Sequence, residues 1–248
     1  MSDINFLPSR LDRAFSRLAF PEAAKALMAM QQGNPAYVSF WEDFTGTRSG
    51  TWPAGTPYAS TVGTGTEVIG ITQAVDGTMT VTTGATDGNS AGQALGLNWK
   101  GDNGVYFIGK VKLDRITLGK LEFGLTDAVG DDGAVDVKAT PTFTATDCAL
   151  FVFDRTEDAN LTFITAATGA AGANADWSGT FSADTYVIAE IRVQNDMAAG
   201  YINGHLVGSG AINGASPLTP WVYVETLTGA SATITATVDY WGVVGPRS

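Results

Sequence analysis

The sequence predicts an all-β protein, an antiparallel β-sandwich preceded by a short helical arm, and three observations support this fold class. Glycine is abundant, with 30 of 248 residues. Charged residues make up only 16% of the chain, whereas globular proteins average roughly 25%. Apolar and polar residues alternate in many short segments separated by turn residues, which is typical of strands. We therefore expect one jelly-roll sandwich over residues 36–248 and a separate arm over residues 1–35.

The arm is expected to contain two short amphipathic helices. Pro8 and Ser9 begin the first helix, and Pro21 with Glu22 begins the second, because proline and an acid favour the first turn of a helix. Gly33-Asn34-Pro35 ends the second helix. Apolar residues at helical spacing are the candidate protein-interface residues of the chain: Leu11, Phe15, Leu18, Leu27 and Met30.

These apolar side chains must be buried against another surface, and two alternatives are open. The arm folds back and covers an edge or a face of its own sandwich, or it docks on a neighbouring subunit. The arm and the sandwich differ in charge. Four basic and three acidic residues give residues 1–35 a net charge of +1. The whole chain carries −11, so residues 36–248 carry −12. This asymmetry predicts that the two parts meet different partners.

From Ala36 onward the chain is predicted to form short strands. In chain order these are Tyr37–Phe44, Glu67–Thr72, Thr78–Thr83, Ala91–Trp99, Val105–Leu113, Leu118–Thr126, Cys148–Phe153, Leu161–Thr165, Tyr186–Val193, Gly200–Ile202, His205–Val207, Leu218–Thr226 and Thr233–Val244. The glycine-rich segments Thr45–Gly65, Asp127–Thr146 and Ala166–Ser182 are predicted loops. Period-two alternation with one polar face predicts two packed antiparallel sheets.

Alternation is clearest in two segments. Val105, Phe107 and Val111 point one way, and Tyr106 and Lys110 point the other. In the last strand the apolar set is Ile234, Ala236, Val238 and Tyr240, so Trp241 is predicted to face outward.

One tight turn is specified by its residues. Asn203-Gly204 favours a type I′ hairpin turn, in which both central residues need φ > 0. His205, the single histidine, begins the return strand and is expected to be exposed. A histidine-dependent hydrolase is disfavoured by that position.

Composition excludes several partners. A net charge of −11 repels double-stranded nucleic acid, so no nucleic-acid partner is expected. No stretch reaches the ~18 apolar residues of a membrane span, and no signal peptide is predicted, so we expect no membrane partner and synthesis in a cytoplasm. Cys148 is the single cysteine and is expected in a buried strand, without a disulfide.

No catalytic, cofactor-binding or metal-binding residue is predicted. One jelly-roll glycosidase pattern, Glu-x-Asp-x-Glu on one strand, fails here, because the neighbours of Glu122 at that spacing are Lys120 and Gly124. Lys120 and Glu122 are instead expected to form a solvated charged face. Four acids share one loop, and turn chemistry explains them better than a Ca²⁺ site: Asp127, Asp131, Asp132 and Asp136.

Two segments carry a family resemblance. "YINGHLVG" (residues 201–208) and the closing "VDYWGVV" (residues 238–244) resemble the C-terminal half of concanavalin A-like, laminin-G-like jelly rolls. Together with the opening "FWEDFTG" (residues 40–46) and the helical arm, they resemble structural proteins of tailed bacteriophages. The resemblance covers about residues 37–247 and matches no catalytic residue.

The resemblance implies a non-enzymatic virion protein. Its expected function is capsid decoration: the arm would bind the major capsid protein on the outer surface of the head, with the sandwich outside as a homo-oligomer such as a trimer. The expected location is the virion, after synthesis in the host cytoplasm. The alternative is a tail-fibre, spike or surface carbohydrate-binding module, with a glycan on Trp52, Trp177 or Trp241. A hydrolase would need a close carboxylate pair involving Glu122, Glu190 or Glu225.

Overall fold

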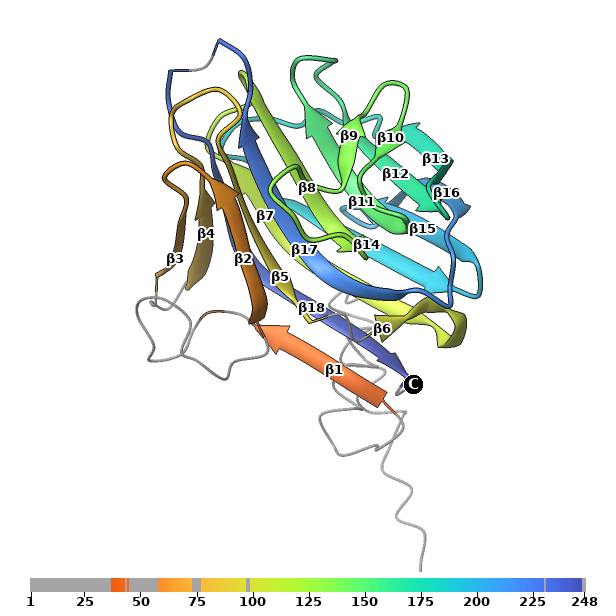
Figure 1. Ribbon diagram of the computed structural model, residues 1–248. Helices are drawn as coiled ribbons and strands as arrows, with labels where there is room; N and C mark the ends of the chain where they lie inside the picture. The colour runs from red at the N-terminus through yellow and green to blue at the C-terminus, as the bar shows by residue number, and fades with distance from the viewer. Residues whose placement is uncertain are drawn as a thin grey trace, which may run out of the picture.

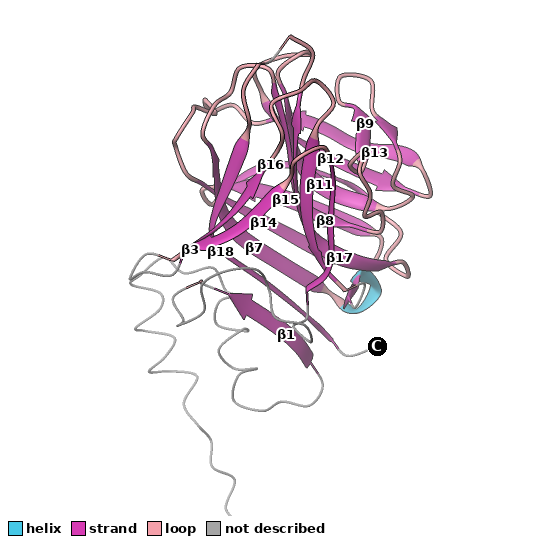
Figure 2. Ribbon diagram, turned by 60° about the vertical axis from the view of Figure 1, so that its left-hand side comes forward, coloured by secondary structure: helices cyan, strands magenta, loops and turns pink. Residues whose placement is uncertain are grey.

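The computed structural model describes residues 37–42, 44, 58–72, 77–96, 99–229 and 231–246. The expected helical arm and its five interface residues lie outside this set, and so does Trp52. The described residues form a sandwich of two antiparallel sheets with a single short 3₁₀ turn, η1 (Gly101–Asn103) (Figures 1 and 2). The predicted all-β antiparallel sandwich is therefore confirmed.

The first sheet, sheet I, has eight strands. Its spatial order is β16 (His205–Ala211), β15 (Met197–Ile202), β14 (Val187–Gln194), β7 (Val105–Leu113), β18 (Thr235–Pro246), β4 (Thr78–Thr82) and β3 (Val68–Thr72), and β1 (Tyr37–Glu42) also pairs with β18. The Asn203-Gly204 turn joins β15 to β16 with φ of 51° and 79°, as the predicted type I′ turn requires.

The second sheet, sheet II, also has eight strands. Its spatial order is β13 (Ala170–Asp176), β12 (Leu161–Ala167), β11 (Cys148–Asp154), β8 (Gly119–Thr126), β17 (Pro217–Thr226), β5 (Ser90–Leu95) and β2 (Tyr58–Thr64), and β6 (Trp99–Lys100) pairs with β17. A separate two-stranded hairpin, β9 (Val135–Val137) and β10 (Thr142–Phe143), lies beside β8 and β11 in Figure 1.

The core lies between the two sheets and is built from their inward-facing alternate residues. Phe107 of sheet I and Phe123 of sheet II meet edge to face with ring centroids 5.2 Å apart. Gly109 permits this contact, because a Cβ at that position would lie 2.5 Å from Cζ of Phe123. The large inward aromatic residues thus fix the spacing of the sheets.

The last strand departs from the predicted alternation. The register of β18 against β7 shifts between Val238 and Tyr240, so Asp239 is an extra residue in a β-bulge. After the bulge the phase is reversed: Trp241 is fully buried in the core, whereas Tyr240 lies with the outer-face residues. The prediction that Trp241 faces outward is therefore wrong, because one inserted residue exchanges the two faces of the strand.

Three segments predicted to be loops contain strands. β2 lies in the first, β9 and β10 lie in the second, and β13 lies in the third. β13 reads Ala-Ala-Gly-Ala-Asn-Ala-Asp, without strong β formers, and its pairing with β12 imposes the strand. Tertiary pairing overrides local preference in this segment.

Candidate functional site

The two sheets expose their outer faces differently. The outer face of the central strands of sheet II is covered by residues 127–147, which we call the covering segment and which include β9 and β10. Ala134 and Val135 of this segment pack in one buried cluster with Leu150, Trp221 and Tyr223 of the sheet. The central part of this face is therefore an internal layer of the protein.

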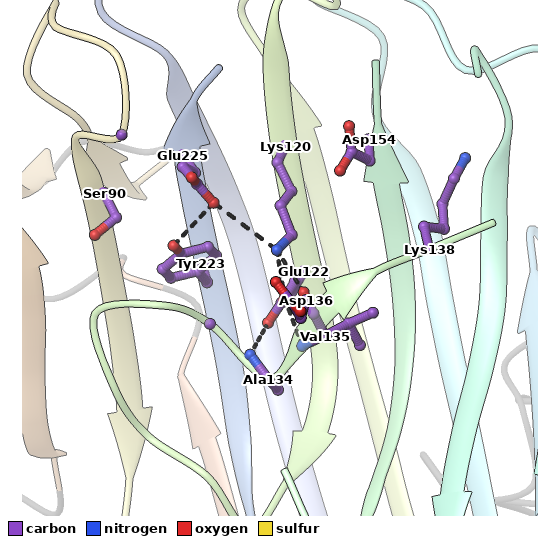
Figure 3. Close-up of polar contacts among 12 residues, drawn as sticks. Ser90, Lys120, Glu122, Ala134, Val135, Asp136, Lys138, Asp154, Tyr223 and Glu225 are labelled. Carbon is purple, nitrogen blue, oxygen red and sulfur yellow. Dashed lines mark hydrogen bonds and ion pairs between the residues drawn. The ribbon is translucent and has the colours of Figure 1, made fainter. Parts of the chain in front are cut away.

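Glu122 lies at the centre of the covered face and is fully buried. Its carboxylate accepts hydrogen bonds from the backbone N–H of Ala134 at 2.8 Å, from the backbone N–H of Val135 at 3.0 Å and from Nε1 of Trp221 at 3.0 Å. Figure 3 shows this carboxylate pointing at the covering segment. Three N–H donors and a neighbouring cation use its acceptor capacity, so Glu122 holds the segment in place.

Lys120 joins the two carboxylates of this face. Its Nζ lies 3.4 Å from Oε1 of Glu122 and 3.8 Å from Oε2 of Glu225, and it also donates to the carbonyl of Val135 (Figure 3). Burial opposes its charge, but the nearby carboxylates of Glu122, Glu225 and Asp154 outweigh burial and raise the pKa of Lys120. The expectation of a solvated Lys120–Glu122 face is wrong, because the covering segment removes both from water.

Glu225 is the more accessible carboxylate of this group. Tyr223 donates its hydroxyl to Oε2 of Glu225 at 3.2 Å. Partial burial raises the pKa of Glu225, while Lys120 opposes that shift. Three carboxylates were candidates for a hydrolytic pair. Glu122 and Glu225 both form ion pairs with Lys120, whereas Glu190 lies on the other sheet.

The acidic loop does not gather its carboxylates. Asp127 accepts from the backbone N–H of Thr146, Asp131 from that of Gly63, and Asp136 from the hydroxyl of Thr142. Within the described part of the chain, no three metal-ligating side chains form a group. These acids tie the covering segment to itself and to β2.

The outer face of sheet I carries a cluster of tyrosines and charged residues, which we call the tyrosine face. Strand register places its members side by side: Tyr106, Ile108, Lys110 and Lys112 of β7; Ile188, Glu190 and Arg192 of β14; Tyr201 of β15; Tyr240 and Val244 of β18. Tyr186 lies just before β14 and contacts the lysines. The polar phase predicted for Val105–Leu113 contained Tyr106 and Lys110, so the sequence indicates that part of the face.

Arg192 is the centre of one half of this face. Its guanidinium carbon lies 4.6 Å from the ring centroid of Tyr201 and 5.9 Å from that of Tyr106. Glu190 accepts the Tyr106 hydroxyl at 2.9 Å and lies 3.5 Å from Arg192. Cation–π contacts and ion pairing hold the half-exposed arginine over the rings.

Lys110 organises the other half. Its Nζ lies 2.6 Å from Asp239, the bulge residue, and 4.6 Å from the ring centroid of Tyr186. Lys112 also lies over Tyr186, at 5.2 Å. Burial, with a contribution from Asp239, raises the pKa of Tyr240 to about 12. The tyrosines of this half remain neutral hydrogen-bonding groups at physiological pH.

Other residues named from the sequence have simpler environments. Cys148 is buried in β11, as predicted, and burial raises the pKa of its thiol. His205 is exposed beside its turn, also as predicted. Trp177 packs partly against the core, so it offers less open ring surface than expected.

In the part of the chain described, no helix has the length and hydropathy needed to cross a bilayer.

Comparison with known proteins places the fold. No family model matches the chain, and no curated protein matches its sequence. A protein of unknown function from Shewanella oneidensis MR-1 superposes with a TM-score of 0.60 at 13% identity, covering 92% of this chain and 95% of that one.

Two further solved structures have known roles. The β-glucanase of Bacillus licheniformis has a TM-score of 0.54 at 12% identity, covering 85% of this chain and 98% of that one. Lectin II of Ulex europaeus has a TM-score of 0.55 at 10% identity, covering 85% and 99%. The fold is therefore the concanavalin A-like jelly-roll sandwich, which enzymes and lectins share.

Proposed function

We propose that this protein is a non-catalytic carbohydrate-binding module whose glycan lies on the tyrosine face. The observation that carries the proposal is the Tyr201–Arg192 pair, a half-buried ring with an exposed guanidinium 4.6 Å from its centroid. A sugar presents an apolar C–H face and a rim of hydroxyls. Tyrosine rings can stack on the C–H face, and arginine, lysine and carboxylate groups can form hydrogen bonds with the hydroxyls.

Exposed apolar residues extend the same surface. Leu206 pairs with Tyr201 across β15 and β16 and is 62% exposed. Met197, on β15, is also exposed. Large exposed apolar groups beside a polar cluster are typical of a binding surface.

The fold supports this class of ligand. Two of the similar structures are a glucanase and a lectin, and both of their names denote proteins that act on or bind carbohydrate. The absence of catalysis is our proposal from geometry: Glu122 is sealed beneath the covering segment and Lys120 lies between it and Glu225. Glu122 therefore lacks the open approach that each member of a glycosidase pair needs.

Binding to a panel of immobilised polysaccharides and oligosaccharides, followed by calorimetry on the best ligand, tests the proposal. Tyr201→Ala and Arg192→Ala should each weaken binding by roughly 10-fold, because each removes a stacking or hydrogen-bonding group worth about 1–2 kcal/mol. Val68→Ala is the matched control, because Val68 is 57% exposed on the same sheet but lies on β3, away from the tyrosine face. Equal loss in all three variants, or no ligand in the panel, would count against the proposal.

Capsid decoration stays a prediction. Its anchor residues lie outside the described part of the chain. The number of copies of this chain in purified particles, measured by quantitative mass spectrometry against the major shell protein, would test it. A simple ratio to the shell subunit would support decoration, a few copies would favour a tail or spike position, and absence from particles would exclude a virion protein.

A further inference from the structure

Each cationic side chain of the tyrosine face has a carboxylate within ion-pair distance. The three pairs are Lys110–Asp239 at 2.6 Å, Lys112–Asp184 at 3.2 Å and Arg192–Glu190 at 3.5 Å. Asp239 is the bulge residue of β18, and Asp184 lies in the loop before β14. Three cations and three carboxylates leave this part of the described surface without a net charge.

These ion pairs keep both donors and acceptors for a ligand. An ammonium and a guanidinium each have several N–H donors, and a carboxylate has several lone pairs, so one contact uses only part of each group. The groups also reach solvent, because the side chains of Lys110, Arg192 and Asp184 are 32%, 49% and 68% exposed. The face therefore offers donors and acceptors side by side.

Hydroxyl groups suit such pairs, and anionic groups do not. A sugar hydroxyl both donates and accepts, so it bonds to either member of a pair and leaves the ion pair intact. A carboxylate or sulfate only accepts, and it would meet a cation that is already neutralised and, beside it, a carboxylate of its own sign. Like-charge contacts of this kind exclude a ligand from a surface.

The charge of the whole chain favours the same class of ligand. The chain carries −11, so a polyanion approaches against the field of the protein. The tyrosines add no positive charge, and burial raises the pKa of Tyr186 and brings that of Tyr240 to about 12. Both hydroxyls are therefore neutral hydrogen-bonding groups at physiological pH.

Strand positions indicate the length of the ligand. Tyr201 lies on β15 and Tyr240 on β18, and β14 and β7 separate these two strands. Three strand spacings amount to about 14 Å, which is farther than one sugar ring extends. A ligand that contacts both tyrosines is therefore a chain of sugars.

We infer that the tyrosine face binds a neutral polysaccharide chain, one without carboxylate, sulfate or phosphate groups. This inference rests on the proposed function and adds the class of glycan. The sugar chain crosses from β15 to β18, and its hydroxyls bond to the three ion pairs. No charged group of the face loses its partner when the ligand binds, which avoids the cost of desolvating an unpaired charge.

Calorimetry with three matched ligands tests the role of charge. The first is the best-binding neutral oligosaccharide of the panel, the second is the same oligosaccharide with its primary alcohols oxidised to carboxylates, and the third is the neutral amide of that acid. We expect the acid to bind about 5-fold more weakly than its amide. Added salt should strengthen binding of the acid, because screening weakens the repulsion, and should leave binding of the two neutral ligands unchanged.

One substitution tests whether the ion pairs set this preference. Asp184→Asn leaves Lys112 without its carboxylate, and asparagine tolerates the φ of 56° at this position. We expect the affinity for the acid to rise about 5-fold. The matched control is Asp132→Asn, which makes the same change in total charge at an exposed position of the covering segment and should leave that affinity unchanged. Urea unfolding checks that both variants are folded.

The outcomes separate this inference from the proposed function. If the acid binds more tightly than its amide and Tyr201→Ala abolishes that binding, the neutral class is wrong and glycan binding at this face stands. Equal gains in the Asp184 and Asp132 variants, or no gain in either, would show that the ion pairs of the face do not set the preference and would overturn the inference. No binding by any glycan, or binding that Tyr201→Ala does not weaken, would overturn both.

Discussion

At the scale of single residues, environment decides what a carboxylate does. Glu122 has the residue type of a glycosidase catalyst and lies at the centre of a sheet in a fold that includes a glucanase. Two backbone N–H groups of the covering segment and the indole of Trp221 bind it instead. A buried charge with this many partners stabilises a particular arrangement of the chain.

Replacing Glu122 should therefore affect stability. Glu122→Ala leaves Lys120 and three N–H donors without their acceptor, so we expect the free energy of unfolding to fall by about 3–5 kcal/mol. Glu122→Gln keeps an acceptor oxygen and should cost less. Urea unfolding followed by tryptophan fluorescence measures both changes. Glu67→Ala, at an exposed site, is the control, and an equal effect there would contradict the structural role of Glu122.

Residue type alone predicts part of the tyrosine face but not the burial of Glu122. Tyr106 and Lys110 were assigned to the polar phase of their strand, and the structure confirms that they share the outer face. Lys120 and Glu122 were also in the polar phase of theirs, but the sequence does not show that residues 127–147 fold back over them. A period-two pattern identifies two faces of a strand and does not state which face a distant segment will cover.

At the scale of elements, the alternation of each strand and its pairing with distant strands determine which residues face the core. Asn203-Gly204 and the alternating strands were predictable because local chemistry and tertiary structure agree. The sequence does not indicate β13, because alanine and glycine have low β propensity. The predicted orientation of Trp241 is wrong because no residue type marks the position of the bulge at Asp239. In both, long-range pairing supplies the information that the local sequence lacks.

Gly109 tests the spacing between the sheets. Gly109→Ala places a Cβ 2.5 Å from Cζ and 2.9 Å from Cε1 of Phe123, so the ring must shift within a packed core. We expect destabilisation by about 1–3 kcal/mol from this overpacking. Gly130→Ala is the matched control, since nothing lies within 4 Å of its added Cβ. A shift in the denaturation midpoint of the Gly109 variant, absent in the control, is the expected result.

At the scale of the whole molecule, one core joins both sheets. The main apolar cluster includes Phe107 and Trp241 from sheet I with Phe123 and Phe151 from sheet II. Neither sheet can lose its partner without exposing that cluster to water. The sandwich should therefore unfold as one unit.

This cooperativity predicts coincident transitions. Tryptophan fluorescence reports Trp241 between the sheets and Trp221 beneath the covering segment, whereas far-ultraviolet circular dichroism reports the strands of both sheets. The two signals should follow one denaturation curve with one midpoint. An earlier fluorescence transition would show that the covering segment opens before the sandwich unfolds.

The bulge at Asp239 also has an evolutionary consequence. Asp239 is the extra residue, so loss of that single codon would leave Val238 followed directly by Tyr240 and would keep Trp241 and Val243 on the core side. Loss of Gly242 would instead turn Val243 toward water. Many amino-acid changes on the outer side of this strand would leave the core intact. Selection on β18 should therefore tolerate loss of a residue at the bulge more readily than loss of one beyond Trp241.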